Sequence, residues 1–127
     1  MNKYKLNKPF KNKNFIEALK NSIKGIFTAF TMERNIKIDI VIALFVIIIA
    51  FIIKLNYIEF IAIIISIAIV LTAEMFNSAI ENIVDLITEQ YNERAKIIKD
   101  ISSGAVLISS IGAALVAFVI FLNKYIL

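Results

Sequence analysis

Four polar residues recur at helical spacing within a mainly apolar stretch of the chain. Glu74, Asn77, Glu81 and Asp85 are separated by three, four and four residues. At about 100° per residue they fall within roughly 80° of arc, so all four share one face of a helix. Carboxylates on a shared face can bind a divalent cation or take a proton from a hydroxyl group. We call these four residues the acidic row.

The stretch before the acidic row carries no charge from Phe60 to Ala73, as expected for a membrane span. An ionised carboxylate that faces lipid costs at least ~2.5 kcal/mol. The row must therefore face protein, water or a bound cation, which makes Glu74 a functional candidate. Asp85, at the far end of the row, could instead belong to an ordinary solvated stripe.

The composition predicts an all-α integral membrane protein. Of 127 residues 60% are hydrophobic, whereas soluble domains are about half apolar. A spanning helix needs roughly 20 mostly apolar residues, and the uncharged runs predict three spans, at about 36–54, 57–87 and 101–123. We expect a polar junction over 31–39 before the first span and a polar connection over 88–100 before the third.

The amino-terminal region is strongly basic, with nine of the 14 Lys and Arg residues between Lys3 and Lys37. We expect residues 1–14 to be a flexible basic segment, and 15–127 to form a single membrane-embedded domain. Apolar residues at helical spacing over 15–31 predict an amphipathic helix in the headgroup plane. Basic residues beside a span favour anionic lipid over nucleic acid as the partner.

The distribution of basic residues predicts a multi-pass protein of the cell membrane with a cytoplasmic amino terminus and an outer carboxyl terminus. A cleavable signal peptide would place an apolar core soon after the basic start. Because the first long apolar run begins near Ile40, we expect the first span to be retained as an anchor.

The chain has no Cys and no His, which excludes thiol chemistry and His-based acid–base pairs. The remaining oxygen ligands suit a hard cation such as Mg²⁺. Glu33 precedes the first span, and Lys99 and Asp100 precede the third, so all three spans bring charge to the cytoplasmic interface. Such a set could handle phosphate beside a lipid alcohol. No Walker pattern accompanies it, and a small ion-conducting or proton-coupled subunit would also place acids on a span.

Five short segments closely resemble motifs of the prokaryotic diacylglycerol kinase family. They are EMFNSAIENIVD at 74–85, AKIIKD at 95–100, SGAVL at 103–107, ERN at 33–35 and KG at 24–25. The resemblance implies a homotrimer of three-span subunits with amino-terminal surface helices. It also implies phosphate transfer from MgATP to a membrane lipid alcohol, at sites between neighbouring subunits.

The resemblance assigns roles to individual residues. Glu74 is implied as the general base and, with Ser103, as a contact of the lipid substrate. Glu33 and Glu81 are implied as the Mg²⁺ ligands. The residues implied in nucleotide binding are Lys24, Glu33, Asn77, Glu81, Asp85, Lys99 and Asp100.

The motifs look most like the Gram-positive branch of the family, whose members mostly phosphorylate undecaprenol. We therefore expect undecaprenol to be converted to undecaprenyl phosphate, with diacylglycerol conversion to phosphatidic acid as the alternative. A non-enzymatic channel or regulatory subunit is the remote alternative. The sequence departs from the family pattern at Asn14, Ile23 and Asp39, where a basic residue, an aromatic residue and a Glu or His are common.

Overall fold

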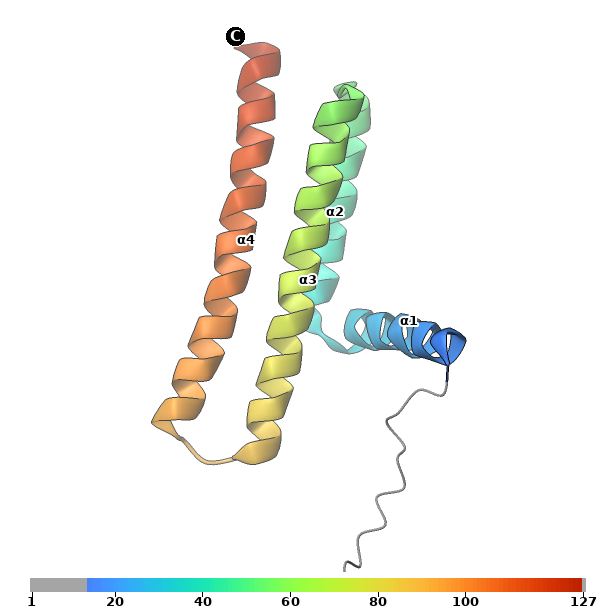
Figure 1. The fold of residues 1–127 in the computed structure, drawn as a ribbon. Helices are drawn as coiled ribbons and strands as arrows, with labels where there is room; N and C mark the ends of the chain where they lie inside the picture. The colour runs from blue at the N-terminus through green and yellow to red at the C-terminus, as the bar shows by residue number, and fades with distance from the viewer. Residues whose placement is uncertain (1–13, 127) are drawn as a thin grey trace, which may run out of the picture.

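Four helices make up the part of the chain that the computed structural model describes, residues 14–126. They are α1 (Phe15–Met32), α2 (Arg34–Ile52), α3 (Tyr57–Ile87) and α4 (Glu93–Tyr125). In Figure 1, α2, α3 and α4 run alongside one another, and α1 points away from them at a steep angle. Over 14–126 there is no strand, which confirms the all-α expectation. Apart from Asn14, the predicted flexible segment 1–14 lies outside the described residues.

The helices α2, α3 and α4 are long and apolar enough to cross a membrane. Long apolar runs become helices in lipid because a helix satisfies its own backbone hydrogen bonds where no water is present. With 31 and 33 residues, α3 and α4 are about 46 and 50 Å long at 1.5 Å per residue. The hydrocarbon core is about 30 Å thick, so both helices extend beyond it, and both pass below α1 in Figure 1.

The break between α1 and α2 is a single residue, Glu33. The expectation of a polar junction over 31–39 is wrong, because α1 continues to Met32 and α2 begins at Arg34. Glu33 has an extended backbone, its N–H donates to the Ala29 carbonyl, and its own carbonyl accepts from the Lys37 N–H. One extended residue thus turns the chain, and the Glu33 carboxylate lies at the corner.

The connection between α3 and α4 is also shorter than expected. A polar connection over 88–100 is wrong for its second half, because α4 begins at Glu93. The Asn92 side chain caps the helix by accepting from the backbone N–H groups of Arg94 and Ala95. Polar residues can be helical as well as apolar ones, so the change in polarity did not mark the start of this helix.

At the opposite end, α2 stops in a Schellman motif. The Leu55 N–H donates to the Ala50 carbonyl, and the Lys54 N–H donates to the Phe51 carbonyl. Lys54 has φ 55°, the left-handed conformation that glycine usually supplies at this position. Its carbonyl also accepts from Nζ of Lys124, at 3.0 Å, which ties the end of α4 to this turn.

The central helix of the bundle is α3, which packs extensively on α4 and also on α2, while α1 contacts α2. Within residues 14–126 the buried apolar side chains are few: Ile36, Ala43, Ala50, Ile63 and Val84. Small residues such as the two alanines let helices approach closely in a membrane. No residue in the most apolar window of α4 is buried, so its outer surface is available to lipid or to another chain.

The turn at Lys54 yields a prediction about stability. Lys54→Gly should raise the free energy of unfolding by about 1 kcal/mol or less, because glycine removes the left-handed strain at some entropic cost. The carbonyl that accepts from Lys124 is retained. Unfolding by sodium dodecyl sulfate in mixed micelles measures the change. Ile53→Gly is the matched control, since Ile53 has φ −82° and should lose stability. Equal destabilisation by both variants would contradict the role given to Lys54.

Candidate functional site

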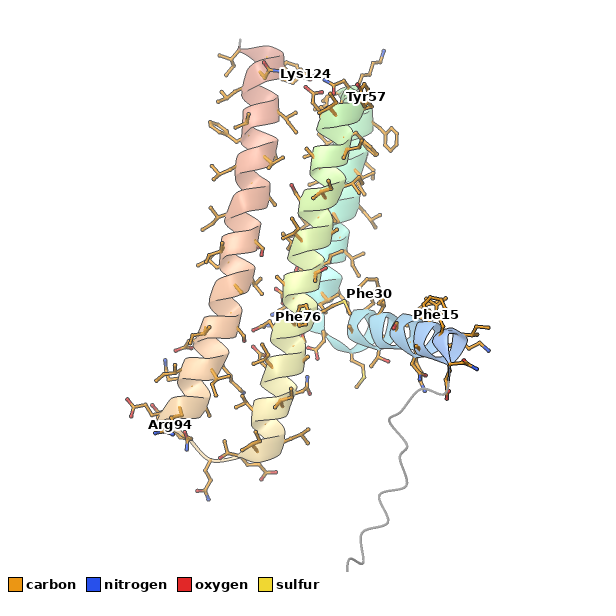
Figure 2. The ribbon with its side chains drawn as sticks, in the orientation of Figure 1. Phe15, Phe30, Tyr57, Phe76, Arg94 and Lys124 are labelled. Carbon is orange, nitrogen blue, oxygen red and sulfur yellow. The ribbon has the colours of Figure 1, made fainter. Side chains whose placement is uncertain are left out.

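The acidic row passes from the buried to the exposed part of α3. Glu74 and Asn77 are 7% and 6% exposed, Glu81 is half-buried and Asp85 is exposed. Figure 2 shows Phe76, within this stretch, at about the height of Phe30 near the end of α1. The row therefore begins where α1 meets the bundle and continues past it.

Glu74 is the buried acid of the row. Its Oε2 atom is buried and has no hydrogen-bond partner among the described residues. The carboxylates of Asp39, Glu81 and Glu33 lie close enough to interact with it electrostatically. A buried carboxylate without a donor is costly, and three further acids increase that cost. The arrangement therefore favours a proton, a hydroxyl donor or a cation at Glu74.

Asn77 joins the row to α4. Its Nδ2 donates to Oε1 of Glu81 at 3.1 Å, and its Oδ1 accepts from Oγ of Ser102 at 2.6 Å. Ser102 is 7% exposed, so this contact is buried between α3 and α4. The Asn77 side chain is thereby held from both ends.

Glu33 reaches the row from the corner between α1 and α2. Its Oε1 accepts from Nδ2 of Asn82 in a long hydrogen bond of 3.5 Å. The same Nδ2 donates to the Ser78 carbonyl at 2.7 Å. Asn82 follows Glu81 directly, so the Glu33 carboxylate lies beside the part of α3 that carries Glu81, although the two acids are 48 positions apart in the sequence.

Two ion pairs form a second polar region, near the end of α3 and the start of α4. Nζ of Lys99 lies 2.6 Å from Oδ1 of Asp85 and joins α4 to α3, whereas Lys96 pairs with Asp100 within α4. Lys99 and Asp100 are therefore adjacent in sequence but paired with different partners. A cavity of about 310 Å³ opens here, lined by Val84, Asp85, Thr88, Glu89, Gln90, Tyr91, Asn92, Ala95, Lys96, Lys99 and Asp100.

A larger apolar cavity of about 490 Å³ lies along α3 and α4. Its polar lining includes Asn77 and Ser102 at one end and Ser109 farther along α4. The rest of the lining is mainly apolar: Ile65, Ala68, Ile69, Thr72, Ala73, Phe76, Ile80 and Ala105. This groove could hold an apolar chain that leads up to the row.

The acidic side chains of the site meet the needs of Mg²⁺ only in part. Among residues 14–126, no group of three or more acidic side chains is clustered tightly enough to hold a metal alone. Mg²⁺ typically keeps several waters and binds one or two carboxylates together with substrate phosphates. The pair Glu33 and Glu81 fits that requirement, because phosphate oxygens would supply further ligands.

The chain's own fold leaves two of the expected site residues outside this arrangement. Lys24 is exposed on α1, which leads away from the bundle in Figure 1. Within residues 14–126, no hydrogen bond or ion pair joins its ammonium group to the row. Ser103 is exposed, and it is the neighbouring Ser102 that bonds to Asn77.

Comparison with known proteins identifies the family. The family described as prokaryotic diacylglycerol kinase matches residues 20–121. The chain belongs to this family.

Relatives with assigned activities cover most of the chain. It is 33% identical over 110 residues to the undecaprenol kinase of Bacillus subtilis, covering 87% of this chain and 89% of that protein. It is 35% identical over 100 residues to the diacylglycerol kinase of Escherichia coli K12, covering 79% of this chain and 82% of that protein. A diacylglycerol kinase of Synechocystis is 33% identical over 104 residues, covering 81% of this chain but 59% of its own length.

Membership in the diacylglycerol kinase family confirms the expectation of a lipid kinase that uses ATP as co-substrate. Together with three helices able to span a membrane, it also confirms a multi-pass membrane protein. It decides against the channel or regulatory subunit considered as the remote alternative.

Sequence reasoning missed two residues that this kinase brings to the site, Ser102 and Asn82. Ser102, Ala105 and Ser109 are three and four residues apart, the same spacing that revealed the acidic row. A stripe of small residues at that spacing is typical of helix packing in membranes, and it could have identified the face of α4 that meets α3. Asn82 gave no such signal, because its contact with Glu33 depends on the corner in the chain.

Proposed function

We propose that this chain transfers the γ-phosphate of ATP to the hydroxyl of undecaprenol, giving undecaprenyl phosphate and ADP. The proposal rests on the buried carboxylate of Glu74, whose Oε2 has no hydrogen-bond partner among residues 14–126 and which lies near Glu33 and Glu81. A base in that place suits a lipid hydroxyl group that enters the site from the membrane. The similarity to an undecaprenol kinase over 87% of the chain supports this substrate.

Glu74 acts as the general base. Its free Oε2 accepts the hydroxyl proton while the hydroxyl oxygen forms a bond to the γ-phosphorus. The bond from that phosphorus to the β,γ-bridging oxygen breaks, and ADP leaves with the electron pair. Burial keeps water away from Glu74, so a lipid hydroxyl is favoured over water as the nucleophile.

Glu33 and Glu81 hold Mg²⁺ together with the phosphate oxygens. The bound ion would neutralise charge on the transferring phosphate. Glu33 comes from the corner before α2 and Glu81 from the middle helix, so the two carboxylates approach from different sides. Their bonds to Asn82 and Asn77 keep each carboxylate oriented.

Four further residues bind the nucleotide: Lys99, Asp85, Asp100 and Asn77. Lys99 can turn from Asp85 to a phosphate oxygen, because both side chains are at least one-third exposed. The cavity of about 310 Å³ beside them gives room for part of the nucleotide. Ser103, next to the packed Ser102, contacts the lipid together with Glu74.

The working unit is a homotrimer in the cell membrane, with the amino terminus cytoplasmic and the carboxyl terminus outside. The helix α1 is an amphipathic surface helix whose exposed apolar residues enter the headgroup region. They include Phe15, Ile16, Leu19, Ile23 and Phe27. Because α1 carries Lys24 away from its own row, Lys24 serves the nucleotide site of a neighbouring subunit.

Diacylglycerol is the alternative substrate. The Escherichia coli and Synechocystis relatives are both named diacylglycerol kinases, at identities equal to or above that of the undecaprenol kinase. Either lipid presents a primary hydroxyl group, and either could place an apolar chain in the groove of about 490 Å³.

A direct assay distinguishes the substrates. Purified protein in mixed micelles with Mg²⁺ and labelled ATP should phosphorylate undecaprenol with a kcat/KM about 10-fold or more above that for diacylglycerol, a range that pocket contacts can supply. Faster transfer to diacylglycerol would favour the alternative, and no labelled lipid from either substrate would refute a kinase acting on these alcohols.

Removing the base should stop turnover without abolishing ATP binding. Glu74→Gln keeps the shape of the side chain but cannot take a proton, so kcat should fall by about 10² to 10⁴, while the KM for MgATP changes little. The matched control is Glu93→Gln, an exposed acid at the start of α4, which should retain wild-type turnover. Near-normal turnover of Glu74→Gln would show that another group is the base.

Weakening a metal ligand should alter the requirement for Mg²⁺. Glu81→Gln should raise the Mg²⁺ concentration for half-maximal rate by about 10-fold or more, since a carboxylate ligand is replaced by a neutral amide. Titration of Mg²⁺ at constant ATP measures this, with Glu93→Gln as the control. An unchanged titration curve for Glu81→Gln would remove Glu81 from the metal site.

A further inference from the structure

A chain of two hydrogen bonds, the first of them buried, runs from α4 to the proposed metal ligand. Oγ of Ser102 donates to Oδ1 of Asn77 at 2.6 Å, and Nδ2 of Asn77 donates to Oε1 of Glu81 at 3.1 Å. We propose that Ser102 is a positioning residue, which fixes the Asn77 amide and thereby aims the Glu81 carboxylate. This inference rests on the proposed role of Glu81 in holding Mg²⁺.

The polarity of the chain allows only one good arrangement. A carboxylate oxygen accepts hydrogen bonds and does not donate, so Glu81 needs the NH₂ group of Asn77. The amide oxygen then points to α4 and needs a donor there. Ser102 supplies that donor, because its hydroxyl is the group that contacts Oδ1 of Asn77. If the amide were reversed, its oxygen would face the Glu81 carboxylate and the two would repel.

Burial makes this arrangement rigid. Asn77 and Ser102 are 6% and 7% exposed, so water cannot readily replace the hydrogen bond between them, whereas the bond from Asn77 to the half-buried Glu81 is partly open. The single hydroxyl proton of Ser102 is directed mainly at Asn77, at 2.6 Å, and is shared with the more distant Lys99 carbonyl, at 3.1 Å in the preceding turn of α4. The position of the serine is thus set by α4, and the serine transmits it across the helix interface to Asn77.

Without the Ser102 hydroxyl, the amide oxygen of Asn77 is a buried acceptor that lacks a donor. The side chain then gains by rotating to find another partner, and its NH₂ group leaves Glu81. The carboxylate loses its orientation, which is the effect expected when a partner of a metal ligand is removed. Loss of the Ser102 hydroxyl should therefore reduce metal affinity more than it slows the chemical step. Glu74, the proposed base, is not a member of this series of hydrogen bonds.

The first experiment measures metal binding without turnover. Binding of Mn²⁺ to the full-length protein in micelles, with a non-hydrolysable ATP analogue, is followed by electron paramagnetic resonance of free Mn²⁺. Ser102→Ala should weaken binding about 10-fold. Ser102→Thr, which keeps the hydroxyl, should restore it to within about threefold. Ser110→Ala removes another half-buried hydroxyl on α4 and should bind Mn²⁺ as the wild type does.

The second experiment is a kinetic test. In the lipid kinase assay, Ser102→Ala should raise the half-saturating Mg²⁺ concentration about 10-fold, with kcat at saturating Mg²⁺ within about twofold of wild type. A variant that is merely destabilised would lose kcat at every Mg²⁺ concentration. Wild-type Mn²⁺ binding by Ser102→Ala, or failure of Ser102→Thr to restore it, would overturn the inference.

A double variant separates this inference from the proposed function. If Glu81 is the ligand that Ser102 positions, Ser102→Ala should add less than about twofold to the defect of Glu81→Gln, because coupled residues are non-additive. Additive defects would overturn the positioning role. If Glu81→Gln alone leaves Mn²⁺ binding unchanged, the metal assignment fails. If it weakens binding but Ser102→Ala does not, only the positioning role fails.

Discussion

The cost of burying Glu74 in a membrane-spanning helix constrains the rest of this structure. A carboxylate directed at lipid would be strongly unfavourable, so α3 must keep this face covered. The covering comes from α2 and α4, which both pack on α3. The central position of α3 is consistent with that need, and Asp39 on α2, which also has a buried carboxylate oxygen without a hydrogen-bond partner among residues 14–126, is subject to the same constraint.

Much of the polar contact between helices involves the same residues as the candidate site. The apolar core within residues 14–126 is small, and the spans expose most of their apolar surface. Between the helices, Ser102 bonds to Asn77, Lys99 pairs with Asp85, and Asn82 bonds to Glu33. In a membrane such polar contacts add to close packing in holding helices together. Substitutions in the row are therefore expected to affect packing as well as chemistry, which is why conservative replacements are the informative ones.

The sequence predicted the helical spans because long apolar runs have one stable backbone structure in lipid. It also placed the four members of the row on one face, since that depends only on helical geometry. It did not reveal that α4 begins at Glu93, because polar residues outside the hydrocarbon are free to be helical or not. Nor did it distinguish Ser102 from Ser103: neighbours on a helix differ by about 100° in direction, and only the packing of α4 against α3 decides which serine is buried.

The direction of α1 has a consequence for the proposed trimer. The helix leaves the bundle at Glu33 and carries Lys24 away from the acidic row of its own chain (Figure 1). If Lys24 binds nucleotide, it must do so at the acidic row of a second subunit. The acidic row of its own subunit must then receive α1 from the third subunit. Such head-to-tail contacts close into a ring when the rotation permits. The single extended residue Glu33 would then have two roles, since its backbone sends α1 to the neighbour while its carboxylate stays at the row of its own chain. The corner in the chain, rather than any loop, would be the element that joins one subunit's site to the next.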